Sequence, residues 1–195
     1  MSLTRNGYLH PEELPEIKRE LTVRPVTNAL GNFGNGGPSF KVWRRAAESK
    51  GLLVPRYFGI ERFGPPTRDV RPDHARNDLI VFSGRLRDAT RQPEAFAAGV
   101  RAFEEKGGGV LSLPCGYGKT TVALALSAQL KVRTMIVVHK EFLANQWVEK
   151  IKEFCPSATI GRVQGDTFDV EKDFVIAMIQ TMCMRAVSYT HLRAH

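Results

Sequence analysis

One stretch of the sequence decides the fold of this chain: Leu113-Pro-Cys-Gly-Tyr-Gly-Lys-Thr120. It follows the apolar run 110–113 and precedes a helical pattern, so it predicts a strand, a glycine-rich turn and a helix. In that arrangement the backbone N–H groups of the turn and the N-terminus of the helix point at one anion. Gly116 and Gly118 allow the unusual backbone angles and the close approach of phosphate oxygens that such a turn requires. The stretch is therefore interpreted as a phosphate-binding loop.

The residue types of the loop indicate a nucleoside triphosphate, with ATP favoured. Lys119 would reach the β- and γ-phosphates and the Thr120 hydroxyl would ligate Mg²⁺, so both are candidate catalytic residues and Thr120 is the candidate metal ligand. The strict pattern has Gly at position 113, where this chain has Leu, so the match is to the shorter Gly-x-Gly-Lys-Thr core. Cys115 is interpreted as a small residue that fills a tight turn, because nothing near it in the sequence would stabilise a thiolate. The candidate nucleotide contacts in the loop are Pro114, Cys115, Gly116, Tyr117, Gly118, Lys119, Thr120 and Thr121.

From Leu79 onward the sequence alternates short apolar runs with helical periods, which is typical of an α/β fold with a parallel sheet. Predicted strands cover 79–82, 110–113, 133–138, 159–163 and 173–179, and predicted helices cover 92–106, 120–130 and 141–154. In the last helix one face carries Leu143, Trp147, Ile151 and Phe154. Trp147 is therefore predicted to anchor the core rather than to stack on a base.

Residues 1–78 have a different character. They are rich in Pro and Gly, with short β-branched and aromatic segments at 21–26, 40–44 and 52–58. These features predict a small, mostly β accessory module that ends in a polar, proline-containing linker. The last ten residues, 186–195, match no periodicity and resemble translated adapter sequence, so we expect a non-native tail there. The predicted α/β domain thus covers 79–185.

The charge of the chain is basic but evenly spread. The net charge is +8, with 13 basic and 9 acidic residues before Leu79 and 15 and 11 from there on, a surplus of four in each part. Such a spread fits a solvated surface about as well as a polyanionic partner. The three cysteines fit neither a disulfide framework nor a zinc site. No apolar run reaches the roughly 18 residues of a membrane span and no secretion signal is recognised, so a cytoplasmic protein without a membrane partner is expected.

Residues 113–121 resemble motif I of the superfamily 2 helicases, in the form found in xeroderma-pigmentosum group B type enzymes and their relatives in phages and large DNA viruses. Residues 137–147 resemble motif Ia, 160–166 the strand and turn after it, and 176–182 the strand with its Gln-Thr exit. The resemblance covers 79–185, and 52–59 resembles the N-terminal region of the viral and phage members.

The resemblance implies a RecA-like P-loop NTPase domain in an ATP- and Mg²⁺-dependent DNA helicase, located in the cytoplasm or at a viral replication or transcription site within it. It implies an adenine-reading segment at Arg87 and Gln92, although two or so extra residues precede Gln92 here. It also implies contacts to the backbone of a nucleic-acid strand at loop ends that follow predicted parallel strands. These residues are His139, Lys140, Gln164, Gly165, Gln180 and Thr181.

The sequence departs from the family in one important respect, because it contains neither a DExH nor a DExD box. Hydrolysis needs that acidic residue to hold Mg²⁺ and position water, and usually an arginine from a second RecA-like domain, which is also missing. We therefore expect this chain alone to bind nucleotide weakly and to turn over little.

Two other functions are compatible with the loop. One is a P-loop transferase or kinase for a small molecule, which would have a lid that binds the phosphate acceptor. The other is a non-catalytic nucleic-acid-binding module, whose binding to single strands would be indifferent to ATP and to the loss of Lys119.

Overall fold

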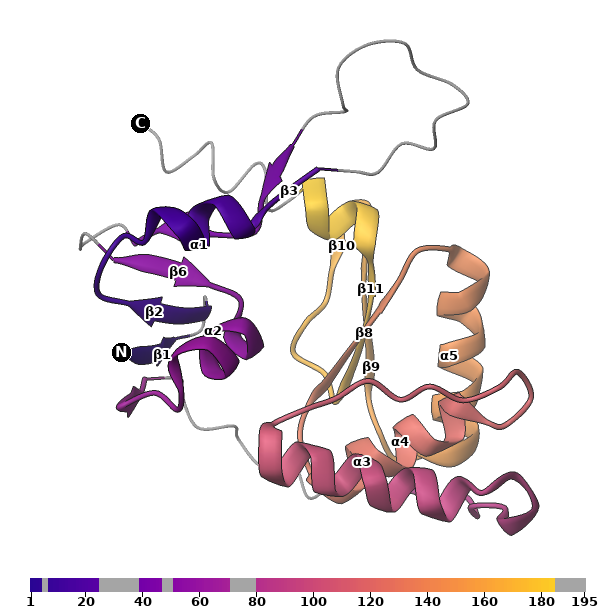
Figure 1. Ribbon diagram of the computed structural model, residues 1–195. Coiled ribbons are helices and arrows are strands. Elements are labelled where there is room, and N and C mark those ends of the chain that lie inside the picture. The colour runs from indigo at the N-terminus through magenta and orange to yellow at the C-terminus, as the bar shows by residue number, and fades with distance from the viewer. Residues whose placement is uncertain (5–6, 25–38, 47–50, 71–79, 185–195) are drawn as a thin grey trace, which may run out of the picture. The chain divides into compact units, whose positions relative to one another are not determined.

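The computed structural model of the chain describes residues 1–4, 7–24, 39–46, 51–70 and 80–184. The chain divides into two compact units, Met1–Asp73 and His74–His195, whose helices and strands are drawn in Figure 1. Each unit has a hydrophobic core of its own. The predicted boundary after residue 78 and the predicted tail 186–195 both lie outside the described residues.

The first unit is built on a five-stranded sheet with the strand order β5-β6-β2-β1-β7. Neighbouring strands are antiparallel except for the pair β1 and β7. The strands are β1 (Ser2–Thr4), β2 (Gly7–His10), β5 (Arg44–Arg45), β6 (Leu52–Val54) and β7 (Arg68–Asp69). Two further strands, β3 (Thr22–Val23) and β4 (Phe40–Lys41), pair antiparallel in a sheet of their own. This first unit is therefore rich in β structure, as the sequence predicts.

Two helices complete the core of the first unit: α1 (Pro15–Glu20) and α2 (Arg56–Phe63). The fully buried side chains include Tyr8, Ile17 and Leu52, and burial of each aliphatic one stabilises the fold by about 1.5–3 kcal/mol. Segment 52–58, predicted as one strand, is instead a strand that gives way to α2. The reason is Pro55, which offers no N–H to a strand ladder and has a φ suited to the start of a helix.

The second unit contains a four-stranded sheet with the order β10-β9-β11-β8. The strands are β8 (Thr134–Val138), β9 (Ile160–Gln164), β10 (Thr167–Phe168) and β11 (Phe174–Met178). Strand β11 is parallel to both β8 and β9, whereas β10 returns antiparallel to β9. The predicted α/β fold with a mainly parallel sheet is confirmed.

Three helices of the second unit match their predicted ranges closely: α3 (Gln92–Lys106), α4 (Lys119–Leu130) and α5 (Glu141–Phe154). In Figure 1, α5 runs alongside the sheet and α3 packs against α4. One core cluster joins Leu124 of α4, Ile151 of α5 and Ile176 of β11, and Trp147 packs against this cluster. The prediction that Trp147 is a core residue is therefore confirmed.

Two predicted strands do not form. Among the described residues, neither 80–82 nor 110–113 pairs with any strand. A strand is stable only where a neighbour completes its hydrogen bonds, and an apolar run cannot provide that neighbour by itself. Val110 is 99% exposed, so this part of the run lies on the surface although its composition resembles that of a core strand.

Candidate nucleotide-binding site

The loop predicted to bind phosphate leads directly into α4. Gly116 has φ 80° and Gly118, the N-cap of α4, has φ 78°. Both values lie in the left-handed region, which glycine adopts without a steric penalty. The space around the two residues differs, because a Cβ on Gly118 would lie 2.4 Å from Nε2 of Gln92 whereas a Cβ on Gly116 would meet nothing within 4 Å. Gly118 is thus constrained by its backbone angle and by a neighbour, and Gly116 by its angle alone.

The N-terminus of α4 retains the positive end of its helix dipole. Gly118 provides no side-chain cap, and the first turn of α4 contains no acidic residue. The first N–H groups of a helix lack partners within the helix, so they attract an anion when no side chain compensates them. The start of α4 therefore has the positive electrostatic character that a phosphate-binding site requires.

Lys119 folds back over its own loop. Its Nζ donates hydrogen bonds to the main-chain oxygens of Leu113 and Pro114, at 2.9 Å each. The side chain is exposed, and both acceptors are neutral carbonyls. Hydrogen bonds from an ammonium to a charged phosphate oxygen are stronger than those to a carbonyl. The lysine can therefore exchange these two contacts for an incoming phosphate.

Gln92 is the buried link between α3 and the loop. It is 1% exposed, its Nε2 donates to the main-chain oxygen of Tyr117 at 2.9 Å, and its Oε1 accepts from the main-chain N–H of Arg87 at 3.0 Å. The structure thus assigns its carboxamide to the positioning of two backbone segments. The side chain of Arg87, the other predicted adenine contact, is exposed.

The extra residues before Gln92 form a compact turn. Asp88–Thr90 is a single 3-10 turn, and Arg91 follows with φ 51°. The turn reverses the chain so that α3 begins at Gln92 despite the longer spacing. The extra residues therefore change only this turn and do not move the start of α3 away from Gln92.

A hollow of about 480 Å³ lies between the start of α3 and the loop. It is lined by Arg91, Glu94, Ala95, Leu113, Pro114 and Tyr117, among others. Arg91 donates to Glu94 at 2.8 Å, and this hydrogen bond lowers the pKa of the Glu94 carboxyl. Neither Arg91 nor Glu94 belongs to a recognised sequence motif. Their opposite charges three residues apart give a weak signal, but the left-handed backbone of Arg91 has no signature in sequence.

The structure brings together the three loop ends predicted to contact a nucleic-acid strand. They follow β8, β9 and β11, whose parallel direction puts the C-terminal ends at one edge of the sheet. Gln180 Nε2 donates to the main-chain oxygen of His139 at 2.8 Å, and the N–H of Gly165 donates to Thr181 Oγ1 at 3.0 Å. Two hydrogen bonds thus connect the three loops.

These loop residues differ in their exposure to solvent, and therefore in whether their side chains are free to contact a strand. His139, Lys140 and Gln180 are exposed, whereas Thr181 is only 5% exposed and uses its hydroxyl to hold Gly165. Thr181 therefore holds the loop of Gly165 in place, and its contact with a strand stays a prediction. Lys140 is also the N-cap of α5, so it begins a helix as well as facing solvent.

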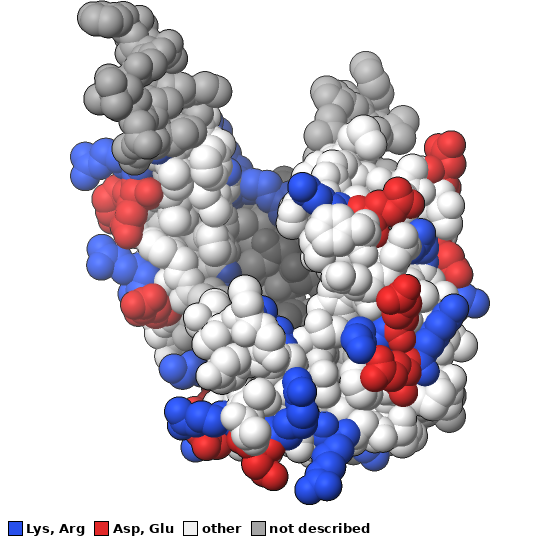
Figure 2. Space-filling model, turned by 90° about the vertical axis from the view of Figure 1, so that its right-hand side faces the viewer, with Lys and Arg blue, Asp and Glu red and all other residues white. Residues whose placement is uncertain are grey.

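The described charges do not form a continuous basic stripe on the face drawn in Figure 2, where Lys and Arg alternate with Asp and Glu. The ion pair of Lys150 with Glu153 on α5 is one example. Such alternation is typical of a solvated surface. Within the described ranges no group of three or more His, Cys, Asp or Glu side chains could hold a metal ion, and no helix has both the length and the apolar character of a membrane span.

Comparison with known proteins finds a matching family and several related proteins. Residues 85–193 match the model of the family described as "Type III restriction enzyme, res subunit". The chain is 30% identical over 192 residues to a provisionally named ATP-dependent RNA helicase of Acanthamoeba polyphaga mimivirus, which covers 92% of this chain and 36% of that protein. It is 30% identical over 141 residues to a provisionally named helicase of Invertebrate iridescent virus 3, covering 67% and 42% of the two chains.

A shorter match joins the chain to a cellular protein. It is 36% identical over 69 residues to a DNA 3'-5' translocase of Sulfurisphaera tokodaii, covering 35% of this chain and 16% of that protein. The chain therefore spans less than half the length of each of these curated relatives.

Proposed function

The chain belongs to the helicase family of the type III restriction enzyme res subunit, within superfamily 2, and from this premise we propose that it is the nucleotide-binding part of an ATP-dependent DNA helicase or translocase. In this proposal the whole protein couples ATP hydrolysis to movement along a strand. The three relatives described above are named as helicases or as a translocase, which favours this function over a small-molecule transferase.

The phosphate loop is the observation that carries the proposal. Two glycines with positive φ, a lysine bonded only to carbonyls and a helix N-terminus without acidic residues together suit a triphosphate. Lys119 would exchange its contacts with Leu113 and Pro114 for the β- and γ-phosphates. The hollow beside Tyr117 is the space that we assign to the base and ribose.

Mg²⁺ fits the described residues only in part. The Thr120 hydroxyl is suitably placed at the start of α4, and the remaining ligands would be phosphate oxygens, water and an acidic residue supplied by the whole protein. The bound ion would neutralise charge on the phosphates. The described residues therefore account for nucleotide binding, and the hydrolytic step requires groups from beyond them.

The sheet edge supports a role in binding nucleic acid. His139, Lys140 and Gln180 are exposed at the same edge, and Gln180 fixes the backbone of His139. Contacts from these groups to phosphates would be independent of base sequence. We assign DNA as the strand because of the resemblance to the xeroderma-pigmentosum group B type motifs and the match to a DNA translocase.

The proposal is tested by strand-stimulated ATP hydrolysis in the full-length protein. Lys119→Ala should lower turnover by about a hundredfold or more, because a positioned charge on the phosphates is lost. Lys152→Ala removes the same charge from an exposed position on α5 and should leave turnover unchanged. Undiminished turnover in the Lys119→Ala variant would refute the assignment of the loop.

The choice of DNA over RNA is tested with single strands of one sequence, prepared once as DNA and once as RNA. DNA should stimulate hydrolysis more strongly, and the double variant His139→Ala/Lys140→Ala should weaken that stimulation and flatten its dependence on salt. Equal or stronger stimulation by RNA would overturn the choice of DNA. An unchanged salt dependence would show that His139 and Lys140 are merely solvated.

A further inference from the structure

The hollow between the start of α3 and the phosphate loop has mostly apolar walls and one pair of charged residues. Ala95, Leu111 and Leu113 are among the apolar residues that line it, and its volume of about 480 Å³ is within the usual range for small-ligand sites. Among the described residues that line it, only Arg91 and Glu94 carry a formal charge. In such sites apolar walls bind the ligand and a few polar groups fix its orientation. Arg91 and Glu94 are therefore the groups that would orient a base here.

The start of α3 is tied to the phosphate loop through Tyr117. This residue lines the hollow, and its main-chain oxygen accepts a hydrogen bond from Nε2 of buried Gln92, the first residue of α3, at 2.9 Å. Arg91 immediately precedes Gln92, and Glu94 lies in the first turn of the helix. The start of α3 thus holds both the loop and the charged pair at this hollow.

The ion pair between Arg91 and Glu94 leaves part of each side chain without a partner. Nε of Arg91 donates to Oε2 of Glu94 at 2.8 Å, and Nη2 of Arg91 donates to the same oxygen. Among the described residues no hydrogen bond ends at Oε1 of Glu94 or begins at Nη1 of Arg91. The hydrogen bond from Arg91 lowers the pKa of the Glu94 carboxyl, so this group is ionised near neutral pH. The pair thus offers a ligand one charged acceptor and one charged donor.

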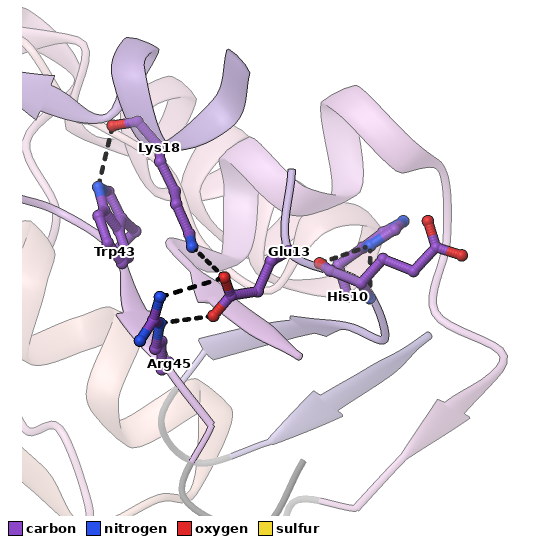
Figure 3. Close-up of polar contacts among 6 residues, drawn as sticks. His10, Glu13, Lys18, Trp43 and Arg45 are labelled. Carbon is purple, nitrogen blue, oxygen red and sulfur yellow. Dashed lines mark hydrogen bonds and ion pairs between the residues drawn. The ribbon is translucent and has the colours of Figure 1, made fainter. Parts of the chain in front are cut away.

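Glu13 in the first unit is the contrasting case. Both of its oxygens are occupied, Oε1 by Arg45 and Oε2 by Lys18 and Arg45, as Figure 3 shows. The Glu13 side chain is 30% exposed, whereas that of Glu94 is 62% exposed. Glu13 therefore uses its carboxylate within the fold, and Glu94 keeps one oxygen available to a ligand.

Arg91 occupies a backbone position that suits glycine better. Its φ is 51°, in the left-handed region, where a side chain with a Cβ raises the free energy of the backbone. Glycine is also well tolerated at a helix N-cap, which is the position of Arg91 in α3. An exposed ion pair between residues three apart adds little stability in return. Stability alone therefore favours glycine at this position, and an arginine there indicates a role for its guanidinium.

We propose that Arg91 and Glu94 select adenine over guanine in the bound nucleotide. One edge of adenine has the N6 amine beside the N7 acceptor, so Glu94 Oε1 accepts from N6 while Arg91 Nη1 donates to N7. The same edge of guanine has two acceptors, O6 and N7, so O6 would face the carboxylate and be repelled. The inference rests on the proposed function, because it takes this hollow as the site of the base, and it adds the residues that choose the nucleotide.

The test measures how well ATP and GTP displace a fluorescent ATP analogue from the full-length protein in the presence of Mg²⁺. The wild type should prefer ATP. In Glu94→Ala the acceptor is lost and all donors of Arg91 become free for the O6 and N7 of guanine, so the ratio of ATP affinity to GTP affinity should fall about fivefold or more. The affinity for ATP should drop and that for GTP should rise, whereas a general loss of structure would weaken both alike.

The matched control is Glu153→Ala. It removes the carboxylate of another exposed ion pair between residues three apart, the pair with Lys150 on α5, and should keep the wild-type ratio. A wild type without preference for ATP, or a Glu94→Ala variant with the wild-type ratio, would overturn the role of the pair.

Arg91→Gly separates the guanidinium from the backbone. Glycine adopts a φ of 51° without strain, so the thermal midpoint should stay near the wild-type value or rise. The affinity for ATP should nevertheless fall about threefold or more, because the donor to N7 is lost. Wild-type affinity for ATP in this variant would show that Arg91 only forms the turn.

Strand-stimulated hydrolysis and the affinity ratio report on different groups. Lys119→Ala should weaken ATP and GTP binding alike and leave their ratio unchanged, because Lys119 would contact phosphates that both nucleotides share. If no nucleic-acid strand stimulates hydrolysis while Glu94→Ala still lowers the ratio, the proposed function fails and the selection of adenine stands. Stimulated hydrolysis together with an unchanged ratio in Glu94→Ala would remove the selection of adenine alone.

Discussion

Gln92 on α3 and Tyr117 in the phosphate loop are joined by a hydrogen bond of 2.9 Å from the Gln92 Nε2 to the Tyr117 main-chain oxygen. The other end of the same carboxamide holds the N–H of Arg87. A single buried side chain therefore fixes the phosphate loop relative to the segment that precedes α3.

Gln92→Ala should weaken both the fold and nucleotide binding. It would leave the Tyr117 oxygen and the Arg87 N–H without their partner, which costs about 1–3 kcal/mol of unfolding free energy. Denaturant unfolding and titration with a fluorescent ATP analogue measure the two effects. Gln129→Ala, at an exposed position on α4, is the control and should change neither. Stability and affinity like those of the wild type would show that the carboxamide is dispensable.

Gly116→Ala and Gly118→Ala should differ although both residues have positive φ. Each forces an L side chain into the left-handed region, at about 1–2 kcal/mol. Only the methyl group of Gly118→Ala also meets the Gln92 carboxamide, which adds about 1–3 kcal/mol of overpacking. Gly118→Ala should therefore have the lower unfolding free energy of the two. Equal losses would mean that Gln92 moves aside without cost.

Ile151→Ala should destabilise the second unit by about 2–5 kcal/mol, because Ile151 is fully buried between the sheet and α4. Gln146→Ala, exposed on the same helix, should stay within about 0.5 kcal/mol of the wild type. Denaturant unfolding followed by far-ultraviolet circular dichroism measures both. A small loss in Ile151→Ala would show that the cluster repacks around the cavity.

Cys155 should make the fold sensitive to alkali. Burial raises the pKa of its thiol above the ordinary 9.0, so the folded chain keeps a proton that the unfolded chain loses. Its stabilising contribution is complete below pH 9 and is lost as the pH rises through the raised pKa, with a slope of at most about 1.4 kcal/mol per pH unit. Unfolding free energies between pH 8 and about 10.5 should fall less steeply in Cys155→Ala than in the wild type. Cys183→Ala, at an exposed thiol, should keep the wild-type slope.

The sequence was informative wherever local chemistry determined the structure. The stripe from Leu143 to Phe154 faces the core as its helical spacing predicts, and Gly107 ends α3 with φ 72°. The glycines of the phosphate loop have the positive φ values that their positions predict. In each case the residue type and the spacing fully specify the local geometry.

The failures have a common physical cause, which is that they depend on distant neighbours. The run 110–113 has the composition of a strand but lacks a partner among the described residues. The hydrogen bonds of buried Gln92 to Tyr117 and Arg87 were not predicted, because they depend on packing that no local pattern encodes, while its contact with the base stays a prediction. The segment after Leu52 could have been read correctly, because Pro55 is a recognised helix-start signal.

Among the described residues β8 is an edge strand, because it pairs with β11 on one side and with no strand on the other. Its Met135 and Val137 side chains are 49% and 52% exposed. An unpaired strand edge can recruit strands from other molecules, and natural proteins suppress such pairing with charged residues, which β8 does not have. The free edge of β8 is therefore the place at which copies of this chain are expected to associate.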